Sequence, residues 1–295
     1  MMIEIIRKIQ PSPIRTVLFD FDGTLSLIRQ GWQDVMISFM VETLQDYGAS
    51  EPEEQLREHV NEYITRLTGK QTIYQMIQLA EEIRQRGGNP EDPLVYKHRY
   101  HERLWEVIKD RVRGLESGEY APHDWLVNGS VAVLENLSAR GAKLFLASGT
   151  DEVFVRREAE LLGLTRFFGN RIYGAVDQYQ LFSKKIVIQR LISDEKLQGS
   201  EFVAFGDGYV EIENAKEVGG TAVGVASEER VRGGKVDEWK RQRLISAGAD
   251  IIVPDFSEQE LLLAYLTGEH ELTPEGSNSR EDPVLIKGSV NPLQD

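Results

Sequence analysis

The chain of 295 residues contains no cysteine, which excludes disulfide bonds, thiolate nucleophiles and cysteine-ligated zinc sites. It has no apolar run near the roughly 20 residues that cross a bilayer, so we expect no membrane-spanning helix. The first ten residues carry charges at Glu4, Arg7 and Lys8, where a secretory signal peptide needs an apolar centre. We therefore expect a cytoplasmic protein with no membrane partner.

The sequence also lacks any cluster of Lys and Arg with interleaved aromatic residues, and its net charge is −14. Such a surface repels phosphate backbones, so nucleic acid is excluded as an expected partner. A small phosphorylated substrate stays compatible, because a metal ion, a lysine and backbone N–H groups can make one cleft locally positive. The hydrophobic content of 41% supports a sizeable core in one large or two ordinary domains.

The most informative motif brings two acids, Asp20 and Asp22, to the end of an apolar strand predicted over residues 17–19. Strands that are apolar on both faces are typical of central positions in parallel sheets, which present ligands at their carboxyl ends. Two carboxylates so close repel each other unless a cation or a shared proton intervenes, so the motif indicates Mg²⁺ or a raised pKa. The alternative is an Asp-Gly turn whose acid only makes turn hydrogen bonds.

The rest of the chain divides into two patterns. Residues 32–113 show helical periodicity almost throughout, with breaks near 48–52, 68–71 and 87–90, which predicts a bundle of about four helices. From residue 128 onward, predicted helices and strands alternate, which indicates an α/β fold with a parallel sheet covered by helices on both faces. The predicted helices are 131–140, 152–162, 184–197, 212–218 and 258–266, and the predicted strands are 143–147, 171–175, 202–205, 221–225 and 251–253.

Two polar segments begin helices in this second part. Ser148 and Gly149 follow the strand 143–147, where a hydroxyl either caps the next helix or helps to bind an anion at its N-terminus. Lys184 and Lys185 begin another helix, a position that costs a lysine about 0.3–1 kcal/mol unless an anion lies nearby. A solvated pair of lysines is the alternative interpretation.

A second acidic turn, Gly-Asp-Gly, follows the apolar strand 202–205 and contains Asp207, with Glu211 four residues further on. A carboxylate at the end of a buried strand is costly without a cation or another partner. Asp207 is therefore a second candidate metal ligand.

These four segments, in this order, resemble the four motifs of the haloacid dehalogenase-like (HAD) superfamily of phosphohydrolases. The resemblance covers about residues 14–26 and 128–266, and Glu211 stands where aspartate is more usual. It implies a Rossmann-like catalytic core at residues 1–26 and 127–267 and a helical cap at 27–126. Residues 268–295 would form a C-terminal tail.

The same resemblance implies a covalent mechanism. Asp20 would attack phosphorus and form an aspartyl-phosphate, and Asp22 would act as general acid and then general base. Mg²⁺ would be held by Asp20, Asp22 through its backbone carbonyl, and Asp207, with Glu211 as a ligand or as a support for one.

Other residues would bind the substrate. Ser148 and Lys184, or Lys185 if the register differs, would bind the phosphoryl oxygens. Further candidate substrate-binding residues are Thr24, Gly149, Lys70 and Arg29.

We expect a Mg²⁺-dependent phosphatase, monomeric or homodimeric, that acts on a small phosphorylated metabolite such as a sugar phosphate or phosphoglycolate. One alternative is a sugar phosphomutase of the beta-phosphoglucomutase type, which returns the phosphoryl group to sugar. Another is a C–P lyase similar to phosphonoacetaldehyde hydrolase, in which Lys70 would form an imine. A binding module with an idle catalytic set is a non-enzymatic alternative.

Overall fold

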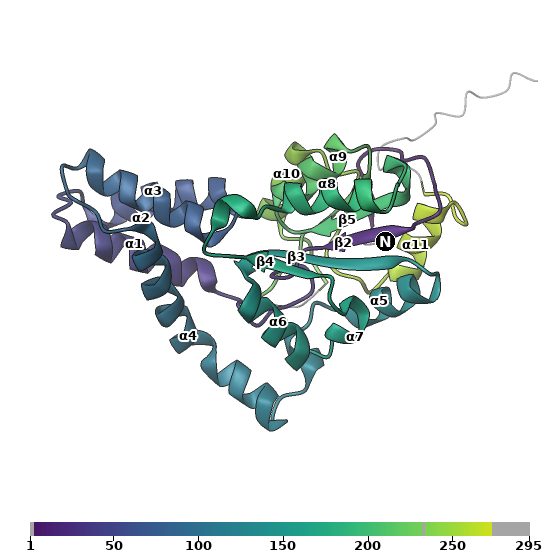
Figure 1. Ribbon diagram of the computed structural model, residues 1–295, viewed down its shortest axis with the longest axis horizontal. Helices are drawn as coiled ribbons and strands as arrows, with labels where there is room; N and C mark the ends of the chain where they lie inside the picture. Colours follow the sequence, from purple (N-terminus) through teal and green to yellow (C-terminus); the bar gives the residue numbers. More distant parts are fainter. Residues whose placement is uncertain (1–2, 232–233, 273–295) are drawn as a thin grey trace, which may run out of the picture.

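The computed structural model describes residues 3–231 and 234–272, and its centre is a seven-stranded sheet in the order β1-β7-β6-β5-β2-β3-β4. Every neighbouring pair is parallel except β1 and β7, so the α/β fold expected from the sequence is confirmed (Figure 1). The predicted tail lies, from residue 273 onward, outside the described residues. The strands are β1 Glu4–Ile5, β2 Thr16–Phe19, β3 Lys143–Asp151, β4 Ile172–Ala175, β5 Phe202–Gly206, β6 Thr221–Val225 and β7 Ile251–Val253.

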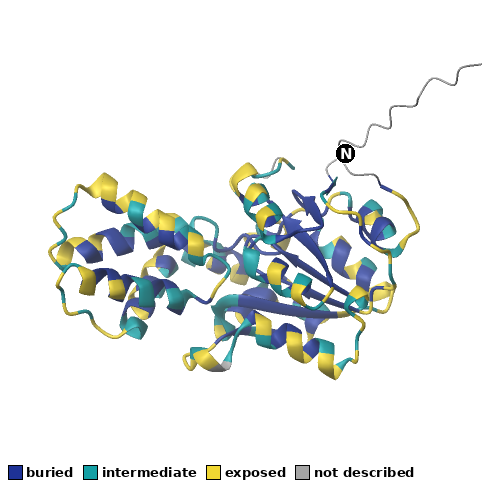
Figure 2. Ribbon diagram, turned by 90° about the horizontal axis from the view of Figure 1, so that it is seen from above, coloured by how far each residue is buried: buried dark blue, intermediate teal, exposed yellow. Residues whose placement is uncertain are grey.

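Strand β2 lies between β3 and β5 and is fully buried, because its side chains alternate between two packed faces. Val17 and Phe19 contact the core beneath α5, α6, α7 and α11, whereas Leu18 faces α8, α9 and α10 (Figure 1). The sheet interior is accordingly buried and the outer helix faces are exposed (Figure 2). The helices of this part are α5 Ser130–Ala139, α6 Glu152–Leu161, α7 Thr165–Phe168, α8 Lys184–Asp194, α9 Tyr209–Glu217, α10 Glu238–Ala247 and α11 Gln259–Thr267.

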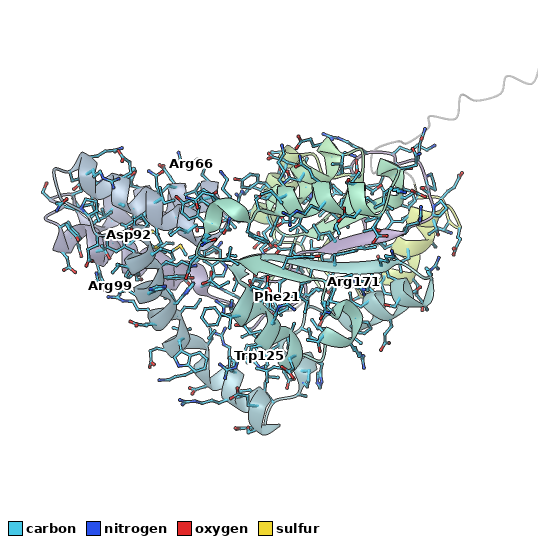
Figure 3. The ribbon with its side chains drawn as sticks, viewed as in Figure 1. Phe21, Arg66, Asp92, Arg99, Trp125 and Arg171 are labelled. Atoms are coloured by element: carbon cyan, nitrogen blue, oxygen red, sulfur yellow. The ribbon has the colours of Figure 1, made fainter. Side chains whose placement is uncertain are left out.

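Four helices between β2 and α5 form a separate bundle beside the sheet, here called the helical insertion (residues 32–117; Figure 1). The longest helix, α4, begins where Asp92 accepts a hydrogen bond from the N–H of Leu94, and it ends at Gly118 with φ of 77°. Asp92 and Arg99 lie far from the sheet, whereas Phe21 lies where the insertion joins it (Figure 3). The helices are α1 Trp32–Asp46, α2 Glu53–Leu67, α3 Thr72–Gln85 and α4 Pro93–Ser117.

The insertion packs closely against the sheet at the loop between α2 and α3. The buried Gln71 amide donates hydrogen bonds to the carbonyl oxygens of Tyr179, at 3.1 Å, and Phe182, at 2.7 Å. A Cβ atom on Gly149 would lie 2.6 Å from the carbonyl oxygen of Lys70, so only glycine allows the two backbones to approach this closely. The insertion therefore closes over the carboxyl ends of the strands.

Some local predictions were wrong or incomplete, and the short helix α7 was not predicted. The two-residue strand β1 has no sequence pattern of its own and depends on pairing with β7. Helix α10 was not predicted because it buries only Lys240 and Leu244, although Asp237 caps its start by accepting a hydrogen bond from the N–H of Lys240. Ser148 does not cap a helix, since β3 continues to Asp151, which is the residue preceding α6.

None of the helices in the described part of the chain is both long and apolar enough to span a bilayer.

Candidate active site

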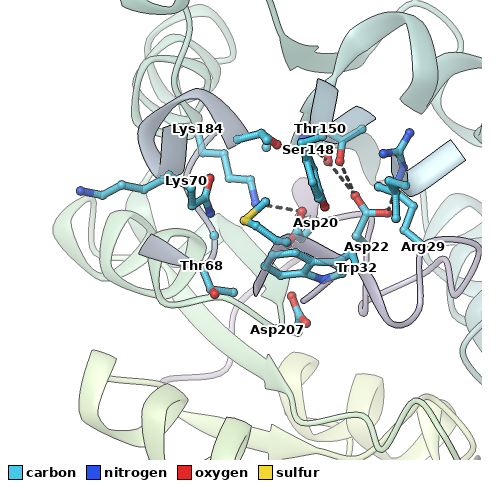
Figure 4. A pocket seen from close by; sticks show the side chains of 17 residues that line it. Asp20, Asp22, Arg29, Trp32, Thr68, Lys70, Ser148, Thr150, Lys184 and Asp207 are labelled. Carbon is cyan, nitrogen blue, oxygen red and sulfur yellow. Dashed lines mark hydrogen bonds and ion pairs between the residues drawn. The ribbon is translucent and has the colours of Figure 1, made fainter. Parts of the chain in front are cut away.

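Asp20 and Asp207 lie at the carboxyl ends of the adjacent strands β2 and β5, at the edge of the sheet that the insertion covers (Figure 4). Asp20 is buried, and its Oδ1 accepts a hydrogen bond from the N–H of Phe21 at 2.7 Å and forms an ion pair with Lys184 Nζ at 2.8 Å. Burial raises the pKa of Asp20, and although Lys184 lowers it, the neighbouring Asp207 raises it again, so it stays above its ordinary value. The site therefore has an excess of negative charge.

Lys184 is the first residue of α8, which Ser183 caps by accepting a hydrogen bond from the N–H of Ile186. The Lys184 side chain is 3% exposed and bridges Asp20 and Glu211. Lys185, the register alternative, is 48% exposed and pairs with Glu217 at 2.8 Å. The fold thus brings Lys184, and not Lys185, to Asp20.

A cavity lies between Asp20 and the helical insertion. Glu211 is completely buried, pairs with Lys184, and does not line this cavity. Its Oε2 atom has no hydrogen-bond partner among the described residues and lies close to Gly206 and Gly208. The sequence left two possibilities open for Glu211, a direct metal ligand or a support for one. Its placement favours a supporting role, in which Glu211 holds Lys184 in position.

Asp22 lies beside Asp20 but has a different set of partners (Figure 4). Its Oδ2 accepts hydrogen bonds from Ser148 Oγ at 3.2 Å and Thr150 Oγ1 at 2.8 Å. Burial raises the pKa of Asp22 to about 7, against the opposing effect of Arg29, whose Nε lies 4.0 Å from Oδ1. A carboxyl group that titrates near neutrality can both give and take a proton.

Arg29 is held in place by Glu158 of α6. Its Nε lies 3.1 Å from both carboxylate oxygens of Glu158, and its Nη2 lies 2.7 Å from Oε1. Both side chains are buried, so this bidentate pair neutralises most of the guanidinium charge. Arg29 lines the cavity, but its geometry suits holding Asp22 better than binding a substrate anion.

The raised pKa of Asp22 gives a stability prediction. Above pH 7 the folded protein holds an ionised, largely buried carboxylate, whereas in the unfolded chain this group ionises near pH 3.8 without that cost. Between these values the unfolded state loses its proton first, so stability falls as the pH rises. Asp22→Asn removes this titration, so we expect its unfolding free energy, relative to that of the wild type, to rise by about 2–4 kcal/mol from pH 4 to pH 8. The range allows for solvent screening, because 20% of the Asp22 side chain is exposed.

Urea unfolding of both proteins at several pH values measures this difference. A gap between the two that stays constant from pH 4 to 8 would contradict the assignment of the raised pKa to Asp22.

Asp207 has partners that the sequence did not reveal. Lys240 of α10 is buried, and its Nζ lies 2.9 Å from Asp207 Oδ2, 2.6 Å from Glu229 Oε1 and 3.2 Å from Ser227 Oγ. Burial lowers the pKa of Lys240, but the carboxylates of Asp207 and Glu229 outweigh this and hold it above its ordinary value. Lys240 therefore fixes one oxygen of Asp207.

A divalent cation fits the charges at this edge of the sheet. Within residues 3–231 and 234–272, no three His, Asp or Glu side chains converge as a complete metal cage. Asp20 and Asp207 nevertheless raise the local negative charge together, and a hard cation with oxygen ligands would relieve it. Two carboxylates with backbone oxygens and water are a donor set typical of Mg²⁺.

The remaining candidate residues from the sequence differ in whether they line the cavity. Gly149 lines the cavity, whereas Thr24 is fully buried and does not. Lys70 also lines the cavity, but its ammonium group extends away from Asp20 (Figure 4) and lies 5.8 Å from the Tyr74 ring centroid. The cavity has a volume of about 80 Å³.

Three functional partners were missed by sequence reasoning. Thr150 is next to Ser148 and Gly149 in the second motif and could have been included as a second hydroxyl. Glu158 and Lys240 sit in helices with no local pattern that sets them apart from other charged residues. Only the three-dimensional fold brings them to Arg29 and Asp207.

The fold and the site define an α/β protein in which acids at the ends of parallel strands pair with the buried lysines Lys184 and Lys240. A family model described as haloacid dehalogenase-like hydrolase matches residues 14–219. The chain therefore belongs to the haloacid dehalogenase-like hydrolases, as the sequence motifs indicated. No curated protein sequence matches it.

Solved structures of this family share the fold at low sequence identity. A predicted phosphoglycolate phosphatase from Haemophilus somnus 129PT is 15% identical, with a TM-score of 0.55 over 85% of this chain and 98% of that one. CbbY from Rhodobacter sphaeroides, solved in complex with phosphate, is 18% identical, with a TM-score of 0.52 over 83% and 96%. A predicted phosphatase from Clostridium acetobutylicum is 18% identical, with a TM-score of 0.53 over 85% and 99%.

Proposed function

We propose that the protein is a Mg²⁺-dependent phosphatase that hydrolyses a small phosphorylated metabolite through an aspartyl-phosphate on Asp20. The observation that carries the proposal is the pairing of buried Asp20 with Lys184 beside a second carboxyl group, Asp22, which contacts Ser148 and Thr150. Burial also raises the pKa of Asp22 to about 7. One group can attack while the other transfers protons. The helical insertion would act as a cap that excludes bulk water.

In the first step, a carboxylate oxygen of Asp20 forms a bond to phosphorus as the bond to the leaving oxygen breaks. Asp22 gives its proton to that leaving oxygen. In the second step, Asp22 takes a proton from a water molecule, whose oxygen bonds to phosphorus and releases Asp20. Ser148 and Lys184 would donate hydrogen bonds to the phosphoryl oxygens, where charge spreads during transfer.

Asp20 and Asp207, with the backbone carbonyl of Asp22, would hold Mg²⁺. When bound, the ion would offset the repulsion between the carboxylates and the phosphoryl group. Lys240, by holding Oδ2 of Asp207, would orient the other oxygen of that carboxylate.

The C–P lyase alternative is not proposed, because the ammonium group of Lys70 extends away from Asp20 (Figure 4). Release of inorganic phosphate from a panel of phosphomonoesters, with Mg²⁺ and with EDTA, tests the phosphatase proposal. We expect turnover that EDTA abolishes and Mg²⁺ restores. Formation of an isomerised sugar phosphate without free phosphate would support a mutase instead.

Gly23 provides a test of the metal site. Its φ is +75°, and a Cβ atom there would lie 2.2 Å from Asp207 Oδ2, so Gly23→Ala must displace the carboxylate. We expect the affinity for Mg²⁺, measured by calorimetry, to fall by about tenfold or more. Gly31→Ala is the matched control, since Gly31 has φ of +88° and nothing within 4 Å of its Cβ position. Equal Mg²⁺ affinities in the two variants would place the ion elsewhere.

A further inference from the structure

The helical insertion lines the cavity with two kinds of side chain. Trp32 and Met36 from α1 and Tyr100 and Leu104 from α4 are aromatic or aliphatic. Thr68 and Thr72, near the start of α3, carry hydroxyl groups, and that of Thr68 donates a hydrogen bond to the carbonyl oxygen of Ile64 at 2.9 Å. A leaving group held here would meet apolar side chains and neutral hydrogen-bonding groups.

The positive charges that line this cavity already have partners or lie turned away. Lys184 pairs with Asp20 and Glu211. Arg29 is neutralised by its bidentate contact with Glu158. Lys70 is exposed and extends away from Asp20 (Figure 4). Among the described residues that line the cavity, every cation that faces the acids thus already pairs with a carboxylate.

The acids make a second anion costly. Asp20, Asp22 and Asp207 all line the same cavity, and the phosphoryl group brings further negative charge. A carboxylate or second phosphate on the leaving group would lose its hydration without gaining a cation. A neutral polyol loses little, because its hydroxyl groups can pair with threonine hydroxyls while its C–H faces pack against Trp32.

We propose that this site selects phosphomonoesters of a small neutral polyol or sugar over those whose leaving group carries a second anion. The proposal rests on the proposed phosphatase function. The sequence motifs do not distinguish sugar phosphates from phosphoglycolate as substrates. The proposed selectivity favours sugar and polyol monophosphates over phosphoglycolate. It also disfavours the bisphosphate intermediate that a sugar phosphomutase must hold.

Matched substrate pairs test this selectivity. Glycerol 3-phosphate and 3-phosphoglycerate differ in a hydroxymethyl group against a carboxylate, as do glucitol 6-phosphate and 6-phosphogluconate. We expect kcat/KM to be about tenfold or more higher for the neutral member of each pair. Equal or higher values for the anionic members would overturn the selectivity.

Hydrolysis of p-nitrophenyl phosphate separates the selectivity from the phosphatase function. If the wild type hydrolyses it and Asp20→Asn does not, the phosphatase function stands, and only the substrate pairs decide the selectivity. If no Asp20-dependent release of phosphate occurs from p-nitrophenyl phosphate or from either pair, the proposed function fails and the selectivity fails with it.

A charge placed in the wall gives a second test in the same assay. Thr72→Lys adds a cation at the start of α3, where the side chain is half-buried at the cavity. We expect the neutral-to-anionic ratio of kcat/KM to fall about tenfold. Thr65→Lys, which adds the same charge on α2 outside the cavity lining, should leave the ratio unchanged. An unchanged ratio in Thr72→Lys, with p-nitrophenyl phosphate still hydrolysed, would overturn the assignment of this wall to the leaving group.

Discussion

Asp20→Asn is expected to lower kcat/KM by at least about 10³-fold for every phosphomonoester, because an amide oxygen does not form the covalent intermediate. The variant should stay folded, with a melting temperature equal to or above that of the wild type. The reason is electrostatic: burial and Asp207 already raise the pKa of Asp20, so a neutral amide removes repulsion at the site. Lys184 retains Glu211 as a partner.

Phosphate release and thermal unfolding, measured on the same preparation, check this expectation. Asp34→Asn is the control, because the Asp34 side chain is 70% exposed and pairs with Arg230 on the surface. It should change neither quantity appreciably. A folded Asp20→Asn protein that retained most of its activity would remove Asp20 as the nucleophile.

Lys184→Met is expected to damage both stability and activity. It leaves Glu211, which is completely buried, and Asp20 without their shared cation. Breaking a buried ion pair from one side costs about 3–5 kcal/mol, and losing one charged donor to a phosphoryl oxygen costs about 10²–10³-fold in kcat. Urea unfolding and steady-state kinetics give the two values.

Lys185→Met is the matched control for this change, since Lys185 follows directly on the same helix but is exposed. We expect less than about 1 kcal/mol and little loss of activity from it. Equal effects of the two substitutions would contradict the assignment of Lys184.

The double variant Lys184→Met with Glu211→Gln separates the two roles of the lysine. Neutralising Glu211 removes the unpaired buried charge, so we expect most of the lost stability to return. Activity should stay low, because the donor to the phosphoryl group is still absent. Recovery of activity together with stability would show that Lys184 acts only in folding.

The sequence predicted the sheet well because its strands carry strong local signals. Residues 17–19 and 202–205 are short apolar runs ending in acid-glycine turns, and both form adjacent buried strands, β2 and β5. Parallel strands place such turns at one edge of the sheet, and the resemblance to the HAD motifs implied that Asp20 and Asp207 bind one Mg²⁺ there. The four helices of the insertion were similarly predictable from their apolar periodicity.

What the sequence did not predict depends on contacts between distant segments. Strand β1 exists only through β7, and Lys240 reaches Asp207 only because α10 packs beside β6. Arg29 was expected to bind substrate, yet its charge is taken by Glu158, 129 residues further along the chain. Lys70 has the right position in the sequence, but its backbone, and not its ammonium group, lies against Gly149.

Central to the proposed mechanism is a covalent bond between the phosphoryl group and Asp20. The Asp22→Asn variant tests it with p-nitrophenyl phosphate, whose leaving group needs no proton, so that attack continues while the second step is blocked. Acid quenching and borohydride reduction would convert a phosphorylated aspartate to homoserine, which peptide mass spectrometry locates. We expect a burst of one nitrophenol per protein and homoserine at position 20. Homoserine at another position, or turnover with neither burst nor homoserine, would contradict the mechanism.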